Sequence, residues 1–285
     1  MVGAGVLLVA VDGICWGMLL AVAASGLALT MGVGGVFNLA HGLSYAAGAY
    51  LAWALTDGSW TALAVAAVGA LFGGASAGGA LAYLLRPLPG HLQQALATIA
   101  VALIGGYLLT ALFGAEPLAV APPDDLAGTV TILDRPYPAY RLTFIAAAAA
   151  IACGLGYTLR RTRVGTLARA AGHDLQALGL VGVEPRHVHT AVLAAGTALA
   201  CLAGVLAAPV LGPAPGIEHR ILTQSLIIVV IARVSMARLL AVALLLGQID
   251  TTAVAALPDL APYLPYTILL AVLLTRTALA HRRPA

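Results

Sequence analysis

The chain reads Phe37-Asn38-Leu39-Ala40-His41-Gly42-Leu43-Ser44-Tyr45-Ala46-Ala47-Gly48-Ala49-Tyr50 within a long apolar segment. The amide, imidazole and hydroxyl groups of this stretch are costly in a membrane unless they are paired or face a cavity. If the stretch is helical, its polar groups and glycines share one face, at alternating steps of four and three residues: Gly34, Asn38, His41, Tyr45 and Gly48. The glycines of Gly32-Val33-Gly34-Gly35 weaken the helix at its entry. Two interpretations are open: the face lines a transport path on a broken helix, or it packs on neighbouring helices that satisfy Asn38 and His41.

The composition is that of an integral membrane protein. Of 285 residues, 61% are hydrophobic and 9% are charged, with a mean hydropathy of +1.00, whereas a soluble domain carries about 25% charged residues. All 14 basic residues are arginine, scattered along the chain rather than gathered in a stripe, so nucleic-acid binding is not indicated. The lack of lysine also excludes a P-loop ATPase, whose phosphate-binding loop requires one.

Apolar runs near the length that crosses a bilayer recur throughout the chain. They lie at 5–29, 32–55, 61–85, 92–113, 142–159, 188–209, 219–234, 238–257 and 262–280. We therefore expect an all-α polytopic membrane protein with about eight or nine transmembrane segments, forming a single domain over residues 1–285. The first two runs have hardly any turn between them and the 219–234 run is short. Eight spans plus one broken or re-entrant helix near the N-terminus is therefore equally compatible.

The arginines predict which side of the membrane each connection occupies. The connection at 160–187 holds Arg160, Arg161, Arg163, Arg169 and Arg186, and short loops rich in arginine remain in the cytoplasm. With this connection inside, most of the other arginines fall on the same side, the acidic residues fall mainly outside, Asp250 and Glu218 among them, and the C-terminus is cytoplasmic.

Two connections are long enough to have roles of their own. Residues 114–141 form a proline-rich outer loop, which is either a small ordered cap or partner surface, or a solvated linker. The inner connection at 160–187 carries small and branched apolar residues at helical spacing: Val164, Leu167, Ala168, Ala171, Leu175 and Leu178. Because this face is largely alanine and valine without aromatic residues, we expect it to contact a protein partner rather than lipid headgroups.

The sequence contains no recognisable catalytic arrangement. His187 and His189 could hold a metal ion, although an interfacial pair without metal is the simpler interpretation. No pair of acidic residues lies in the middle of a span, as proton-coupled carriers often require, and Asp12 lies near the outer end of the first run. The energy for transport is therefore expected to come from another chain.

These motifs resemble those of LivH-type permease subunits of the branched-chain amino acid ABC transporter family. The similarity runs through nearly the whole chain and rests mainly on Asn38-Leu39-Ala40-His41-Gly42 with Gly48-Ala49-Tyr50, on Arg86-Pro87-Leu88, on Thr162-Arg163-Val164-Gly165 with Arg169-Ala170, on His173-Asp174-Leu175, and on Gly179-Leu180-Val181-Gly182-Val183. One region departs from the family pattern: where a glycine-rich turn is usual, this chain reads Ile231-Ala232-Arg233-Val234-Ser235-Met236-Ala237-Arg238.

The resemblance implies a non-catalytic permease subunit in a bacterial inner membrane. Its implied partners are a homologous, LivM-like second permease or another copy of itself, two cytoplasmic ABC ATPases that use the ATP and Mg²⁺, and a periplasmic solute-binding protein; no cofactor is bound by this chain. The resemblance places the translocation path at Asn38, His41, Gly42, Tyr45 and Gly48. It places ATPase coupling at Arg163, Gly165, Arg169, Ala170, Asp174, Gly179 and Gly182.

The implied substrates are branched-chain or other hydrophobic amino acids, and relatives of the family serve urea, short amides or aromatic acids. A self-sufficient channel or secondary carrier is the alternative from a different class, and it would require an ionisable relay in the membrane or a second broken helix. An intramembrane enzyme is disfavoured, because His41 and Tyr45 stand one turn apart with no nucleophile or metal-binding group beside them.

Overall fold

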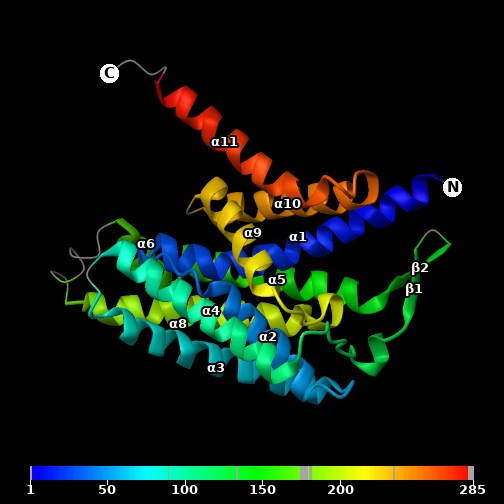
Figure 1. Cartoon of the computed structure of the whole chain (residues 1–285), viewed down its shortest axis with the longest axis horizontal. Coiled ribbons are helices and arrows are strands. Elements are labelled where there is room, and N and C mark those ends of the chain that lie inside the picture. Colours follow the sequence, from blue (N-terminus) through cyan, green and yellow to red (C-terminus); the bar gives the residue numbers. More distant parts are fainter. Residues whose placement is uncertain are drawn as a thin grey trace.

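The computed structural model describes residues 2–88, 90–132, 134–173, 179, 182–233 and 235–281. Long α-helices dominate the fold (Figure 1). They are α1 (Val2–Gly32), α2 (His41–Leu55), α3 (Trp60–Leu85), α4 (His91–Phe113), α5 (Ala139–Arg161), α6 (Arg163–His173), α8 (Pro185–Leu211), α9 (Ile217–Ala232), α10 (Met236–Ala256) and α11 (Leu264–His281). Two short strands, β1 (Thr129–Ile132) and β2 (Arg135–Pro138), and two 3₁₀ turns, η1 (Asp124–Leu126) and η2 (Ala261–Tyr263), complete the described elements.

The helices form an elongated bundle with two distinct ends. In Figure 1 one end carries α6, and the other carries the β1–β2 hairpin and the N-terminus, whereas α11 leans away from the body of the bundle. We refer to these as the α6 end and the hairpin end. Helix α8 packs against α2 and α3, and α1 packs against α8 and α10, so α1 and α8 are the central helices.

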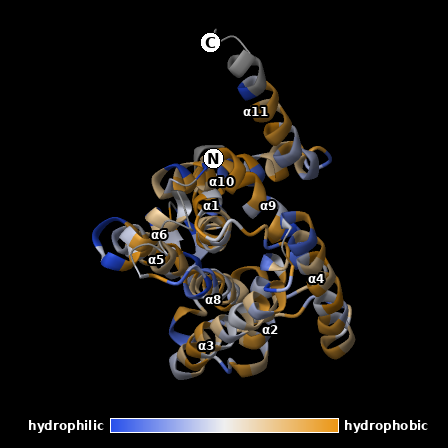
Figure 2. Ribbon diagram, turned by 90° about the vertical axis from the view of Figure 1, so that its left-hand side faces the viewer, coloured by the Kyte–Doolittle hydropathy of each residue, from blue (hydrophilic) through white to orange (hydrophobic). Residues whose placement is uncertain are grey.

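The outward faces of the bundle are apolar. Figure 2 looks along the bundle and shows hydrophobic residues on the outer faces of α3 and α4. Large side chains there are widely exposed, for example Phe72 at 73% and Leu112 at 76%. Within the described residues, six helices are long and apolar enough to cross a membrane: α1, α3, α4, α5, α8 and α10. The expected all-α polytopic membrane fold is therefore confirmed.

The apolar run at 32–55 is not helical in its first third, contrary to the prediction. Helix α1 continues to Gly32, residues 33–40 are non-helical, and α2 begins only at His41. The glycines explain this, because Gly35 adopts a φ of +64°, a left-handed conformation that glycine reaches without steric cost. The chain is thus broken near its N-terminus, as expected, but the break extends eight residues into the predicted helix.

The connection between α4 and α5 is an ordered cap at the hairpin end. Strands β1 and β2 pair antiparallel, and the Asp124 N–H donates to the carbonyl of Gly58 (2.8 Å). Asp12 of α1 accepts hydrogen bonds from Tyr137 (2.8 Å) and Arg141 (2.5 Å). Burial and the neighbouring Asp12 carboxylate raise the pKa of Tyr137, so its phenol remains a donor. The cap is therefore fixed to α1 through Tyr137 and to the turn between α2 and α3 through Asp124.

Candidate functional site

The broken segment, residues 33–40, is held by contacts that a helix would not need. The Val36 N–H donates to the Thr30 carbonyl (3.2 Å), and the Ala40 N–H donates to the side-chain oxygen of Asn38 (3.1 Å). Val36 and Asn38 are both buried. Non-helical backbone is tolerated at membrane depth only where protein covers it or where it lines a water-filled cavity, and protein covers these two residues, whereas Gly35 and Phe37 are exposed.

Thr98 of the neighbouring helix α4 stabilises the broken segment by hydrogen bonds. Its buried hydroxyl accepts from the N–H of Leu39 (3.1 Å) and lies within donating distance of the carbonyls of Phe37 (3.2 Å) and Ala95 (2.9 Å). Thr98 has no distinguishing signal in the sequence, because a threonine in an apolar helix ordinarily bonds to its own helix.

Helix α2 begins with a buried histidine. The Nε2 atom of His41 lies 2.8 Å from the carbonyl oxygen of Ala23 in α1, so this nitrogen carries the proton and donates it. Tyr45, one turn later, is fully buried. The Nδ1 of His41, the hydroxyl of Tyr45 and the Nδ2 of Asn38 have no hydrogen-bond partner among the described residues.

Glycines allow α2 to approach its neighbours at backbone distance. A Cβ added at Gly42 would overlap the carbonyl oxygen of Glu218 in α9, and one at Gly48 would overlap that of Cys201 in α8. The contact with α8 is reciprocal, since a Cβ at Gly204 would overlap the carbonyl oxygen of Tyr45. Small residues at helix interfaces permit this close packing in membranes.

The predicted polar face is therefore only partly formed. Gly34 and Asn38 precede the helix, so they do not share a helical face with His41, Tyr45 and Gly48. The latter three are buried against α1 and α8. The packing interpretation accounts for these contacts, and a role for the same residues in the translocation path stays a prediction.

Helix α6 sits against the ends of α5 and α1. A Cβ at Gly165 would overlap the carbonyl oxygens of Thr158 and Leu159 in α5. A Cβ at Gly172 would lie 2.7 Å from the carbonyl oxygen of Gly32, the last residue of α1. Ala171 is buried with Leu29 and Val33, which flank that end. The helix predicted for coupling is thus in contact with the start of the broken segment.

The apolar face predicted for α6 is divided between two sides. Ala171 is buried and Ala168 is partly buried, but Val164 is 68% exposed and Leu167 is 39% exposed. Gly165 rather than Val164 occupies the tight contact with α5, so Val164 and Leu167 face away from the bundle. The expected contact of this face with a protein partner stays a prediction.

The remaining residues predicted for coupling lie on α6 or follow it in the chain. Arg163, Arg169 and Ala170 are exposed beside Val164 and Leu167. Gly179 and Gly182 are described, Gly182 with a φ of +82°. Asp174, Leu175 and Leu178 lie outside the described residues.

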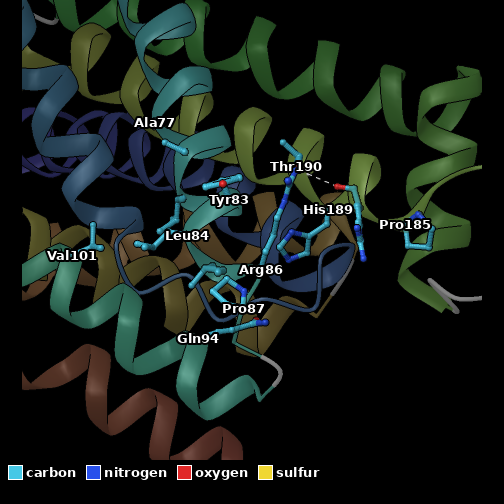
Figure 3. A pocket seen from close by; sticks show the side chains of 14 residues that line it. Ala77, Tyr83, Leu84, Arg86, Pro87, Gln94, Val101, Pro185, His189 and Thr190 are labelled. Carbon is cyan, nitrogen blue, oxygen red and sulfur yellow. Dashed lines mark hydrogen bonds between the residues drawn. The ribbon is translucent and has the colours of Figure 1, made fainter.

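The largest of five described cavities, about 1180 Å³, opens between α3, α4 and α8 (Figure 3). Tyr83, Leu84 and Arg86 line it from the end of α3, and His189 lines it from the start of α8. His187, two residues before His189, is exposed, and its Nδ1 lies 3.4 Å from Oε2 of Glu184. None of the five cavities is lined by the predicted path residues.

Two acids expected on the outer side of the membrane, Asp250 and Glu218, belong to helices and form part of a polar cluster. Asp250 is in α10 and Glu218 is in the first turn of α9, and both are buried. Asp250 accepts hydrogen bonds from Trp16 of α1 (3.0 Å) and Gln224 of α9 (2.6 Å). The apolar run predicted at 238–257 already contained Asp250, and α9 begins at Ile217, so it includes Glu218 as well. The expected position of both acids on the outer side stays a prediction.

The turn between α9 and α10 forms without the glycines that are usual in the resembling family. Helix α9 ends at Ala232, and α10 begins at Met236. Arg233 adopts φ +56° and ψ −150°, a conformation that is essentially restricted to glycine. An arginine in place of a glycine therefore leaves strained backbone at this turn. The chain still passes from α9 to α10 at this point.

Comparison with known proteins agrees with the fold and the motifs. The family model described as the permease component of the branched-chain amino acid transport system matches residues 9–274. No curated protein and no solved structure matches the chain. Because the match spans almost all of the sequence, the chain belongs to the family of branched-chain amino acid transport permease components.

Proposed function

We propose that this chain is the membrane-spanning subunit of an ATP-driven ABC importer that carries branched-chain or other hydrophobic amino acids. The family match over residues 9–274 is the observation that supports the proposal most directly. Urea, short amides or aromatic acids are the alternative substrates within the same class. The chain itself is non-catalytic and binds no cofactor in this proposal, because two cytoplasmic ATPases bind and hydrolyse the ATP.

The proposed topology places the α6 end in the cytoplasm of a bacterial cell, with the inner membrane around the bundle. Six helices cross by length, and α9 and α11 add shorter crossings. Helix α2 has 15 residues and is about 22 Å long at 1.5 Å per residue, too short for a hydrocarbon core of about 30 Å. The extended broken segment completes that crossing, which gives nine segments with both the α6 end and the C-terminus inside.

The proposed coupling route runs from α6 to α2. The ATPases dock on the exposed side of α6, where Val164 and Leu167 lie beside Arg163 and Arg169. The opposite side of α6 contacts Gly32 at the end of α1, where the broken segment begins. A displacement of α6 therefore acts on the broken segment, and through it on α2, without an intermediate element. A second permease, of the same or a sister kind, and a periplasmic binding protein complete the assembly.

The coupling assignment is tested by charge substitution on the exposed side of α6. Val164→Glu with Leu167→Glu should abolish co-purification of the ATPases, because two carboxylates replace the apolar docking contact. The permease should stay folded, since neither side chain is buried. Val130→Glu is the matched control, because Val130 is 46% exposed in the hairpin at the opposite end. Undiminished ATPase association in the double variant would exclude α6 as the docking helix.

Asp250 supports a second candidate, a secondary carrier that works alone. A buried carboxylate within a membrane helix is a group that ion-coupled carriers use. Uptake of labelled leucine into liposomes by the purified chain, driven by an ion gradient without ATP, would support the carrier. Uptake that requires ATP and the ATPases would support the importer.

A further inference from the structure

Trp16 of α1 contacts a cation from α9 and an anion from α10. Arg220 lies over its ring, and Asp250 accepts from its N–H. The guanidinium carbon of Arg220 lies 4.6 Å from the ring centroid of Trp16. The indole N–H of the same tryptophan donates to Oδ2 of Asp250 (3.0 Å). Trp16 is half-buried near the middle of α1, Asp250 is buried within α10, and Arg220 is exposed in the first turn of α9.

Both charged groups retain unused hydrogen-bonding capacity. Trp16 and Gln224 both donate to Oδ2 of Asp250, which leaves Oδ1 without a hydrogen bond from any described residue. The Oε1 of Gln224 is a second buried acceptor with no partner in the described part of the chain. Arg220 makes a cation–π contact with Trp16, but no ion pair with Asp250 or another described acid.

Two cavities meet at this pair. One, of about 540 Å³, is lined by Arg220, Gln224 and Asp250 together with apolar residues that include Val254, Pro262 and Tyr266. The other, of about 470 Å³, is also lined by Arg220 and Asp250. Cavities of this size accommodate small organic ligands. Asp12 and Arg141 line the second cavity as well, but they are paired with each other at 2.5 Å.

The buried carboxylate of Asp250 has no ion-pair partner among the described residues. Charges in a membrane bundle are stabilised when they pair directly, yet the buried carboxylate of Asp250 accepts from the Trp16 N–H and does not pair with Arg220, which is exposed and lies against the Trp16 ring. A carboxylate with a free oxygen, a guanidinium with free donors and an apolar wall are the groups that an amino acid zwitterion requires. Arginine binds carboxylates through paired N–H donors, and an ammonium group needs acceptors of the kind that Asp250 and Gln224 present.

We propose that Arg220 and Asp250 form a binding site for a zwitterionic amino acid on its way through the protein, with the carboxylate at Arg220 and the ammonium at Asp250. The cavity residues around Val254 receive the hydrophobic side chain. This inference rests on the proposed function, because it assigns a place in this chain to the amino acid that the importer carries.

Trp16 provides the readout for the test. The chain has three tryptophans, and Trp53 and Trp60 are 41% and 48% exposed, so Trp53→Phe with Trp60→Phe leaves Trp16 as the sole indole. In nanodiscs, this protein is titrated with L-leucine, with L-leucinamide, which lacks the carboxylate, and with 4-methylpentanoate, which lacks the amine. Leucine should change the Trp16 emission saturably, and each analogue should need about tenfold more ligand, the equivalent of one charge-assisted hydrogen bond.

Single variants then assign each charge to its group. In Arg220→Gln, leucine and leucinamide should bind with equal affinity. In Asp250→Asn, leucine and 4-methylpentanoate should bind with equal affinity. Asp259→Asn, an exposed acid in the connection after α10, should retain the tenfold preference. Equal responses to all three ligands before any charge is changed, or discrimination that persists in both variants, would overturn the site.

The two proposals fail in different experiments. ATPase docking on α6 does not require substrate, so a permease that docks ATPases but responds equally to the three ligands would retain the importer proposal and lose the zwitterion site. A permease that discriminates the three ligands but does not bind the ATPases would retain the zwitterion site and lose the importer proposal.

Discussion

Replacing Gly48 with alanine should loosen the packing of α2 on α8. The added Cβ would overlap the carbonyl oxygen of Cys201 and lie 2.7 Å from its carbonyl carbon and 3.0 Å from its Cα. These are backbone atoms of a central helix, so they cannot rotate away as a side chain would. Overpacking of this kind costs about 1–3 kcal/mol, and we expect the upper half of that range even after alanine's helix preference of about 1 kcal/mol over glycine.

The assay is thermal unfolding in detergent with a thiol-reactive fluorophore. Cys15 and Cys201 are buried and become reactive on unfolding, whereas exposed Cys153 contributes a constant baseline. A loss of about 2 kcal/mol corresponds to a fall in Tm of roughly 4–8 °C for a chain of this size.

Gly79→Ala is the matched control. Gly79 also lies within a helix, α3, but a Cβ there would meet no atom within 4 Å. This substitution should raise the Tm slightly, since it adds helix propensity without a clash. Equal Tm shifts for the two variants would refute the close approach of α2 and α8 as the reason for glycine at Gly48.

Two further substitutions test the broken segment and the α9–α10 turn. Thr98→Val leaves the Leu39 N–H and the Phe37 carbonyl without their partner, so it should cost about 1–3 kcal/mol, whereas Thr98→Ser, which keeps the hydroxyl, should retain most of the stability; a Tm of Thr98→Val equal to that of Thr98→Ser would contradict the contact. Arg233→Gly should relieve the strained φ of +56° and stabilise the protein by about 1 kcal/mol or more, whereas Arg238→Gly, inside α10, should destabilise it; the opposite order of the two Tm values would count against strain at this turn.

Local sequence features predicted the membrane class and most of the helices. Runs of apolar residues locate α3, α4, α5, α8, α9, α10 and α11 to within about three residues, because burial in lipid requires apolar side chains on every face and leaves a composition signal. The glycines before Val36 likewise predicted a break near the N-terminus. The end of that break at His41 was not predictable, since the Thr98 hydroxyl that serves the broken segment belongs to a helix 57 residues further along.

The sequence by itself determined that this chain crosses a membrane many times, which family it resembles and where the amphipathic helix α6 lies. Tertiary structure decided which polar residues meet. Asp250 could be recognised as a buried group only once α1 and α9 had placed Trp16 and Gln224 against it. The division of the α6 face, with Val164 outward and Gly165 inward, likewise depends on the position of the α5 carbonyls. Periodicity is a property of one helix, whereas a hydrogen bond or a backbone contact depends on which helices are neighbours and at what depth they cross.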